Sequence, residues 1–175
     1  MTSHFPLYET YGPEENAPTE AAERDGGARG RRRRHGDNAT AGGGTEAAGE
    51  LDPSHALAIA DLEPLLLAHN VDVYFAGHNH NYETTWPIRN GTLVAKSFDA
   101  PKAPFYVVSG AAGPPNIDKF GPAAEWSRSR IGFDDGFEKA MSYTRMAFER
   151  TRLQFEQVAI ADGKVLDSFE VTRAA

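Results

Sequence analysis

The sequence of 175 residues contains no cysteine. It can therefore form no disulfide and offers no thiolate ligand or cysteine nucleophile, so nitrogen and oxygen atoms must bind any metal ion. It also lacks any run near the ~20 apolar residues of a membrane span, and its start, MTSHFPLYET, lacks the basic and apolar regions of a signal peptide. The net charge of -7 argues against general nucleic-acid binding. We expect neither a nucleic-acid nor a membrane partner.

Large apolar residues are absent from residues 12–50, which contain no Leu, Ile, Val, Met, Phe, Tyr or Trp. Such a segment cannot bury enough apolar surface to offset the entropy lost on folding, so we predict a disordered Gly/Ala/Arg-rich insertion. Its basic run, Arg31–Arg34, is interpreted as a solvated charge run, although a localisation or processing signal is the alternative. Residues 1–11 and 51–175 must then supply the folded structure.

A helix followed by strands is predicted after the insertion. The stretch LDPSHALAIADLEPLLLAHN, residues 51–70, has a helical pattern, with Asp52 as N-cap and Pro53 at the first helical position. Pro64 removes a backbone donor, and we expect a kink or a restart there. Four leucines recur at helical spacing and are predicted to form the buried face: Leu57, Leu62, Leu65 and Leu66.

The strand VDVYFA, residues 71–76, is almost continuously apolar, which is typical of a strand covered on both faces and indicates an α/β layer. A hairpin is predicted around Asn90-Gly91, another apolar strand over residues 104–110, a Gly/Pro-rich loop over 111–126 and three strands between residues 141 and 171. Five aromatic residues in these strands are predicted to lie in the core: Trp86, Phe105, Tyr106, Phe148 and Phe155.

Two histidines, His78 and His80, follow the strand of residues 71–76 directly, after Gly77. Ligands bind at the carboxyl ends of strands in open α/β sheets, and neutral imidazole is the commonest metal-ligating side chain. Gly77 would let the backbone turn closely there. The alternative is that both histidines are polar loop residues without a metal.

Four blocks of the sequence resemble the purple acid phosphatases, members of the calcineurin-like metallophosphoesterases. VDVYFAGHNHNYE is similar to their G-H-x-H-x-Y-E block, and SHFPLY to the preceding block, in which a histidine before x-P-x-Y ligates a metal. PFYVVSGAAG and GKVLDSFEV are similar to a later strand and to the closing strand. The blocks occur in the family's order over residues 2–11 and about 51–172.

The resemblance implies the C-terminal half of a layered α/β/β/α sandwich and a binuclear centre of Fe(3+) with a divalent ion, Zn, Mn or Fe. In it His4 and His78 bind the divalent ion and His80 binds the ferric ion. The implied activity is acid phosphatase hydrolysis of phosphate monoesters by a metal-activated water. Gly77, Asn79, Asn81 and Tyr82 shape the loop. A secreted, vacuolar or lysosomal location is implied too, and two glycosylation sequons, at Asn38 and Asn90, are compatible with it.

The sequence departs from the family pattern in its carboxylates. The family's aspartate blocks, its metal-binding tyrosine and its G-N-H asparagine precede the position of His4, and only three residues precede His4 here. HGDN, residues 35–38, mimics such a block within the insertion, and Pro13 and Glu14 replace the family's substrate-contacting histidines, which leaves the general acid unidentified. The alternatives are a metallophosphoesterase acting on diesters or nucleotides, and a non-catalytic remnant or interaction domain.

Two further histidines receive structural interpretations from the sequence. His69 falls at the end of the predicted helix, where the helix dipole favours an imidazolium. His55 lies in its first turn and would contact substrate only if the insertion folded back. The oligomeric state and the physiological substrate are not indicated by any motif.

Overall fold

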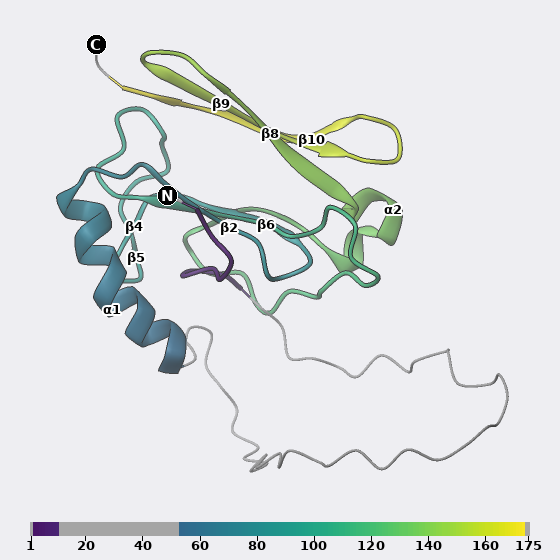
Figure 1. The fold of residues 1–175 in the computed structure, drawn as a ribbon, viewed down its shortest axis with the longest axis horizontal. Coiled ribbons are helices and arrows are strands. Elements are labelled where there is room, and N and C mark those ends of the chain that lie inside the picture. The colour runs from purple at the N-terminus through teal and green to yellow at the C-terminus, as the bar shows by residue number, and fades with distance from the viewer. Residues whose placement is uncertain (1, 11–52, 174–175) are drawn as a thin grey trace, which may run out of the picture.

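The computed structural model describes residues 2–10 and 53–173, so the predictions made for the insertion lie outside the described residues. The described chain forms three layers: the helix α1 (Pro53–Ala68), a five-stranded sheet and a three-stranded sheet (Figure 1). The mixed α/β class predicted from the sequence is confirmed. No described helix is long and apolar enough to span a membrane.

The five-stranded sheet has the order β1-β2-β6-β3-β7 and occupies the middle layer. Parallel pairing joins β1 to β2 and β2 to β6, whereas β3 is antiparallel to both β6 and β7. Its strands are β1 (Thr2–Ser3), β2 (Val73–Ala76), β3 (Tyr82–Thr85), β6 (Phe105–Ser109) and β7 (Ser127–Ile131). The parallel strands fix one end of the sheet as the place where their carboxyl ends meet.

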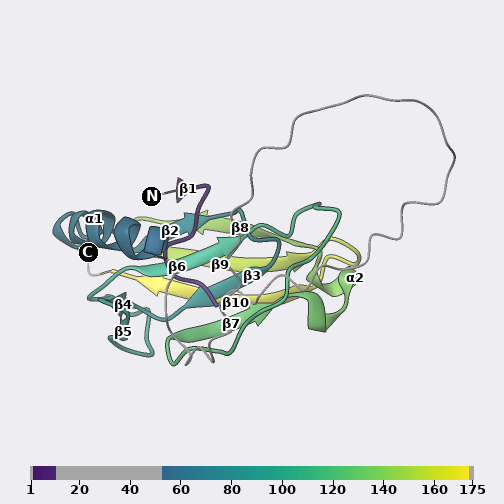
Figure 2. The same ribbon diagram turned by 90° about the horizontal axis from the view of Figure 1, so that it is seen from below.

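The second sheet is an antiparallel meander in the order β10-β9-β8. Figure 2 shows its strands crossing behind the first sheet. Its strands are β8 (Ser142–Phe148), β9 (Arg152–Ala159) and β10 (Val165–Thr172). The remaining elements are the hairpin strands β4 (Ile88–Arg89) and β5 (Thr92–Leu93), the 3-10 turn η1 (Phe133–Asp135) and the short helix α2 (Phe137–Ala140).

Two apolar clusters hold the layers together. The first lies between the sheets, where rings of Phe155 and Phe169 stack at 4.7 Å and Phe105 meets both edge-on. The second lies between the five-stranded sheet and α1, and includes Leu7 and Tyr8 from the N-terminal segment. Because β2 and β6 are covered on both sides, their near-continuous apolar sequences are explained.

Helix α1 begins at the predicted Pro53 but differs from the prediction in two respects. It runs without interruption through Pro64, so the predicted restart is wrong. Its buried contacts come from Ile59 and Leu66, whereas Leu57 is 69% exposed and Leu65 is 55% exposed. The predicted buried face is therefore wrong for two of its four leucines, because the helix is rotated to place Ile59 against the sheet.

The predicted strands are present, and two strands were missed, the two-residue β1 and β7. The hairpin turns at Asn90 and Gly91, both with positive φ, as Asn-Gly turns require. The sequence of β7, SRSRI, has no apolar residue before its last position. Phe148 is 73% exposed, so the prediction that it lies in the core is wrong; it is the last residue of β8, where the strand is no longer covered.

Candidate metal centre

The N-terminal segment and the loop after β2 bring His4 and His78 together. Ser3 pairs with Ala76 in the parallel β1–β2 ladder, so each histidine lies just past the carboxyl end of neighbouring strands. Nε2 of His4 is 3.1 Å from Nδ1 of His78, although the residues are 74 positions apart. Both side chains are exposed. This is the end of the sheet at which ligands bind in open α/β folds.

The loop that carries His78 turns sharply at that residue. His78 has φ +68°, and the N–H of Asn79 donates to the carbonyl of Gly77 at 2.9 Å, which closes a γ-turn around the histidine. A γ-turn with positive φ is rare and strained for a residue with a side chain. Such strain persists only where the surroundings enforce it, and it clusters at functional positions.

His80 is held by a different segment, the loop that precedes β7. Its backbone N–H donates to Oδ2 of Asp118 at 2.7 Å, and the N–H of Asp118 donates back to the carbonyl of His80 at 3.1 Å. Its ring Nδ1 lies 3.2 Å from Oδ1 of Asn116. An Nδ1–H donated to that amide oxygen leaves Nε2 with its lone pair available, which is the arrangement typical of ligating histidines.

Gly110, at the end of β6, makes room for the histidine loop. A Cβ atom at this position would lie 2.0 Å from the carbonyl oxygen of Asn79, so only glycine fits. By contrast, a Cβ atom at Gly77 would meet nothing within 4 Å. Gly77 does take part in the tight turn through its carbonyl, but the contact that leaves no room for a side chain occurs at the neighbouring strand.

A buried carboxylate, Glu83, ties the N-terminal segment to β3. It accepts hydrogen bonds from the backbone N–H of Thr10 at 2.7 Å, from the hydroxyl of Thr10 at 2.8 Å and from Ser127 at 3.1 Å. Burial raises its pKa above the usual value, while these donors act in the opposite direction. Since Thr10 lies six residues after His4, this contact helps to fix the segment that carries His4.

A second carboxyl group, Glu9, lies beneath the histidine loop and accepts a hydrogen bond from the side-chain amide of Asn79. Its pKa is raised to about 7, chiefly because the carboxyl group is buried and also because Glu83 and Asp118 are close. Glu9 and Asp118 therefore each hold one residue of the histidine loop. Glu9, Asn116 and Asp118 were not predicted from the sequence, where their only signal is a position next to blocks already recognised.

The ring nitrogens of His4 and His78 are at hydrogen-bond distance, with one imidazole donating to the other, and the same separation is also that of two nitrogen ligands on one metal ion. Two nitrogens at ~2.0–2.1 Å from one ion are separated by ~2.9 Å at a right angle and ~3.4 Å at a tetrahedral angle. The observed 3.1 Å between His4 and His78 lies within this range. However, residues 2–10 and 53–173 contain no group of three or more His, Cys, Asp or Glu side chains that could hold an ion. Among the described residues, His4 and His78 thus bring two ring nitrogens together, while the His80 ring contacts Asn116.

Two further histidines lie in or next to α1. His69 is exposed just after α1, as predicted, and its N–H donates to the carbonyl of Leu65. His55 falls within the first turn of α1. The mimic HGDN, residues 35–38, lies outside the described residues.

Comparisons with known proteins indicate which family this chain resembles. Residues 103–168 match the family described as "Iron/zinc purple acid phosphatase-like protein C". Acid phosphatase A of Cryphonectria parasitica is 31% identical over 114 residues, covering 64% of this chain and 21% of that protein. Acid phosphatase type 7 of Mus musculus is 32% identical over 123 residues, covering 64% of this chain and 26% of that protein.

A solved structure matches as well. The purple acid phosphatase isolated from yellow lupin seeds superposes with a TM-score of 0.56 at 30% identity, covering 65% of this chain and 19% of that one. Other relatives carry different names: a "Nucleotide pyrophosphatase/phosphodiesterase" of Hordeum vulgare is 32% identical over 120 residues, and a "Probable inactive purple acid phosphatase 1" of Arabidopsis thaliana is 30% identical over 116. This chain spans less than a third of each of these relatives.

Proposed function

Because this chain carries the C-terminal region of a purple acid phosphatase-like protein, we propose that the whole protein is a metal-dependent hydrolase of phosphate monoesters to which this chain contributes histidine ligands. His4 and His78 would hold the divalent ion, Zn, Mn or Fe, and His80 the ferric ion. The observation that carries the proposal is the 3.1 Å between the ring nitrogens of His4 and His78 at the carboxyl ends of β1 and β2.

The residues of this chain have three tasks in the proposed reaction. The γ-turn aims the ring of His78 at His4, Asn116 orients His80, and Glu83 holds the segment that carries His4. Two bound ions would supply a clamp for the phosphate ester and a water of lowered pKa. The described residues form no group of three or more side chains that could hold an ion, so the proposal requires further oxygen ligands suited to ferric iron.

The isolated chain tests the ligand assignment. Three neutral imidazoles supply no negative charge, so we expect residues 1–175 to bind Zn²⁺ weakly through His4 and His78 and to show no enzymatic turnover of p-nitrophenyl phosphate. Titration calorimetry with Zn²⁺ should show His4→Ala and His78→Ala weakening binding by ~10-fold or more, whereas His69→Ala should leave it unchanged. Equal affinity in all variants would overturn the assignment.

Tight binding of two metal ions with turnover that His78→Ala abolishes would contradict the expected weakness of the isolated chain. In that case other donors of this chain, such as Asp37 or Asp99, would have replaced the missing blocks. Metal content after dialysis against iron and zinc distinguishes these results.

The barley relative's name supports a second candidate, hydrolysis of diesters or nucleotides. The complete protein should be assayed with p-nitrophenyl phosphate and bis-p-nitrophenyl phosphate under the same conditions. Preference for the diester would replace the monoester proposal, and activity on neither would support the non-catalytic alternative suggested by the name of the Arabidopsis relative.

Secretion and glycosylation are part of the same proposal. Asn90 is exposed in the β4–β5 turn, where the sequon Asn90-Gly-Thr would be accessible to modification. A mass shift on endoglycosidase treatment of the protein from its native source, lost in Asn90→Gln, would support the location. An unmodified Asn90 in a secreted sample would remove this support.

A further inference from the structure

A cavity of about 180 Å³ lies at the opposite end of the five-stranded sheet from His4 and His78. Val71, in its wall, precedes β2, and Pro104 precedes β6, so the cavity opens at the amino ends of strands whose carboxyl ends carry the histidines. The four residues of β2 alone separate the two sites by ~13 Å. The two places are therefore distinct.

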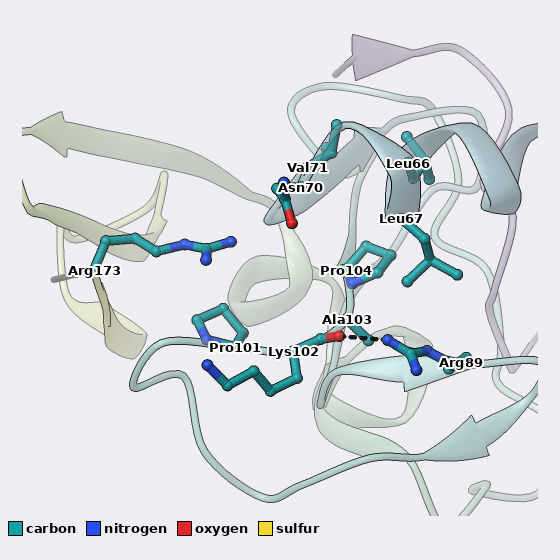
Figure 3. A pocket seen from close by; sticks show the side chains of 10 residues that line it. All are labelled: Leu66, Leu67, Asn70, Val71, Arg89, Pro101, Lys102, Ala103, Pro104 and Arg173. Carbon is teal, nitrogen blue, oxygen red and sulfur yellow. Dashed lines mark hydrogen bonds between the residues drawn. The ribbon is translucent and has the colours of Figure 1, made fainter.

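Three cationic side chains from three different segments surround this cavity. They are Arg89 of β4, Lys102 of the loop before β6 and Arg173 after β10; in Figure 3 Arg89 faces the carbonyl of Lys102, whose side chain extends alongside Pro101. The lining residues include no carboxylate; the others are Leu66, Leu67, Asn70, Val71, Pro101, Ala103 and Pro104. On a chain with a net charge of -7, this is a local concentration of positive charge.

Two of the cations are held in place by hydrogen bonds. Arg89 donates through one terminal nitrogen to the carbonyl of Lys102 at 2.8 Å, which fixes its guanidinium at the mouth of the cavity. Arg173 donates to both carboxylate oxygens of Asp72, from Nε at 3.1 Å and from a terminal nitrogen. This contact balances the charge of Arg173 and also fixes the orientation of its guanidinium.

The charge balance still favours an anion. Asp72 balances the charge of Arg173. Glu63 lies close enough to Arg89 for the guanidinium to lower the pKa of the Glu63 carboxyl group. Lys102 is exposed and has no carboxylate partner among the described residues. Counting three cations against these two carboxylates leaves one positive charge at the cavity, with unused N–H donors on Arg89 and on Lys102. Two prolines, Pro101 and Pro104, also line the cavity.

We propose that this cavity binds a small phosphorylated anion at a site separate from the histidine pair. The planar guanidinium of Arg89 and the point charge of Lys102 are suited to phosphate oxygens, which form short charge-assisted hydrogen bonds with both kinds of donor. The volume accommodates a compact phosphate compound rather than a polymer. The ligand class follows from these side chains and does not depend on the activity proposed above.

The test uses residues 1–175 with inorganic pyrophosphate as the probe, in the presence of EDTA so that no metal bound by histidine attracts it. Binding is measured by titration calorimetry. The double variant Arg89→Gln/Lys102→Gln should weaken binding by ~10-fold or more, because it removes two charge-assisted hydrogen-bond donors. The matched control, Arg145→Gln/Lys164→Gln, removes two exposed cations from the second sheet and its turn and should change binding less than ~2-fold.

Three results would overturn the proposal. The first is that the folded chain binds no detectable pyrophosphate. The second is that affinity falls equally in Arg89→Gln/Lys102→Gln and in the control double variant. The third is that His78→Ala abolishes binding while Arg89→Gln/Lys102→Gln still binds. If circular dichroism shows that the double variant is unfolded, the single variant Lys102→Gln decides, since its side chain is exposed. An unchanged affinity in that variant would also count against the site.

Discussion

At the scale of single residues, the position of the histidine loop depends on Gly110. A methyl group there would meet the carbonyl oxygen of Asn79 at 2.0 Å, which the backbone must relieve by moving. We expect Gly110→Ala to lower the free energy of unfolding by ~1–3 kcal/mol and to shift the NMR signals of His78 and His80.

The matched control for this change is Gly77→Ala, because a Cβ atom there meets nothing within 4 Å. It should leave the histidine signals in place and change stability by no more than ~0.5 kcal/mol. Equal effects of the two substitutions would show that the close approach at Gly110 does not position the loop.

A second residue-scale prediction concerns the pH dependence of stability. The pKa of Glu9 is raised from 4.5 to about 7, so the folded chain retains its proton where the unfolded chain has released it. Stability from this group is therefore fully present below pH ~4.5 and is lost as the pH rises to ~7. In EDTA, the free energy of unfolding should fall by up to ~3 kcal/mol across this range.

Glu9→Gln should reduce this pH dependence, since the amide does not titrate and can still accept from Asn79. Urea denaturation at a series of pH values measures the slope in each protein. An unchanged slope in Glu9→Gln would assign the pH dependence to other groups, such as Glu83, whose pKa is also raised by burial.

At the scale of elements, α1 is fixed by a few side chains rather than by a continuous leucine face. Leu66 is 2% exposed and packs with Tyr74 and Tyr106, whereas Leu57 is mostly exposed. Leu66→Ala should lower the free energy of unfolding by ~2–5 kcal/mol, and Leu57→Ala by less than ~0.5 kcal/mol. Similar losses in both variants would mean that the helix packs in another rotation.

Comparison of these elements with the sequence shows which signals are sufficient. The apolar strands β2 and β6 and the final meander could be predicted, because each carries a two-sided or alternating apolar pattern. The strand β7 could not be predicted, because its polar residues are held by partners far away in the sequence. Ser127 donates a hydrogen bond to Glu83, and Arg128 forms an ion pair with Asp167. The identity of β7 depends on tertiary contacts.

The candidate site was predictable in the same partial way. His4, His78 and His80 are recognisable from motif order, and the structure brings His4 and His78 to 3.1 Å. The supporting contacts at Gly110 and Asp118 were not predictable, because they arise where the ends of β6 and the following loop meet the histidine loop. The rotation of α1 about its axis could not be predicted either, because four leucines at helical spacing allow more than one buried face.

At the scale of the whole molecule, the second sheet extends beyond the first. Alternate residues of β8 share one face, along which Ser142 is buried but Met146 and Phe148 are 37% and 73% exposed. Exposed apolar strand surface of this kind promotes association. We expect residues 1–175 to self-associate at micromolar concentrations, measured by sedimentation velocity.

The variant Met146→Lys/Phe148→Lys should shift the chain toward the monomer. Tyr143→Lys, on the other face of β8, is the control and should shift it less. A wild-type chain that sediments as a monomer at 100 μM or so would contradict the expected association, which derives from the apolar face described above.

The pairing of β1 with β2 also bears on how this chain could diversify. Only two residue pairs join these strands, yet they bring together histidines 74 positions apart. The entropy cost of closing such a connection grows with the logarithm of its length, by only ~0.6 kcal/mol for each doubling. Mutations that lengthen or shorten the connection between Thr10 and α1 therefore encounter little selection through stability. Relatives could gain or lose sequence there while the two imidazoles keep their separation, which makes this connection a tolerant place for evolutionary insertion.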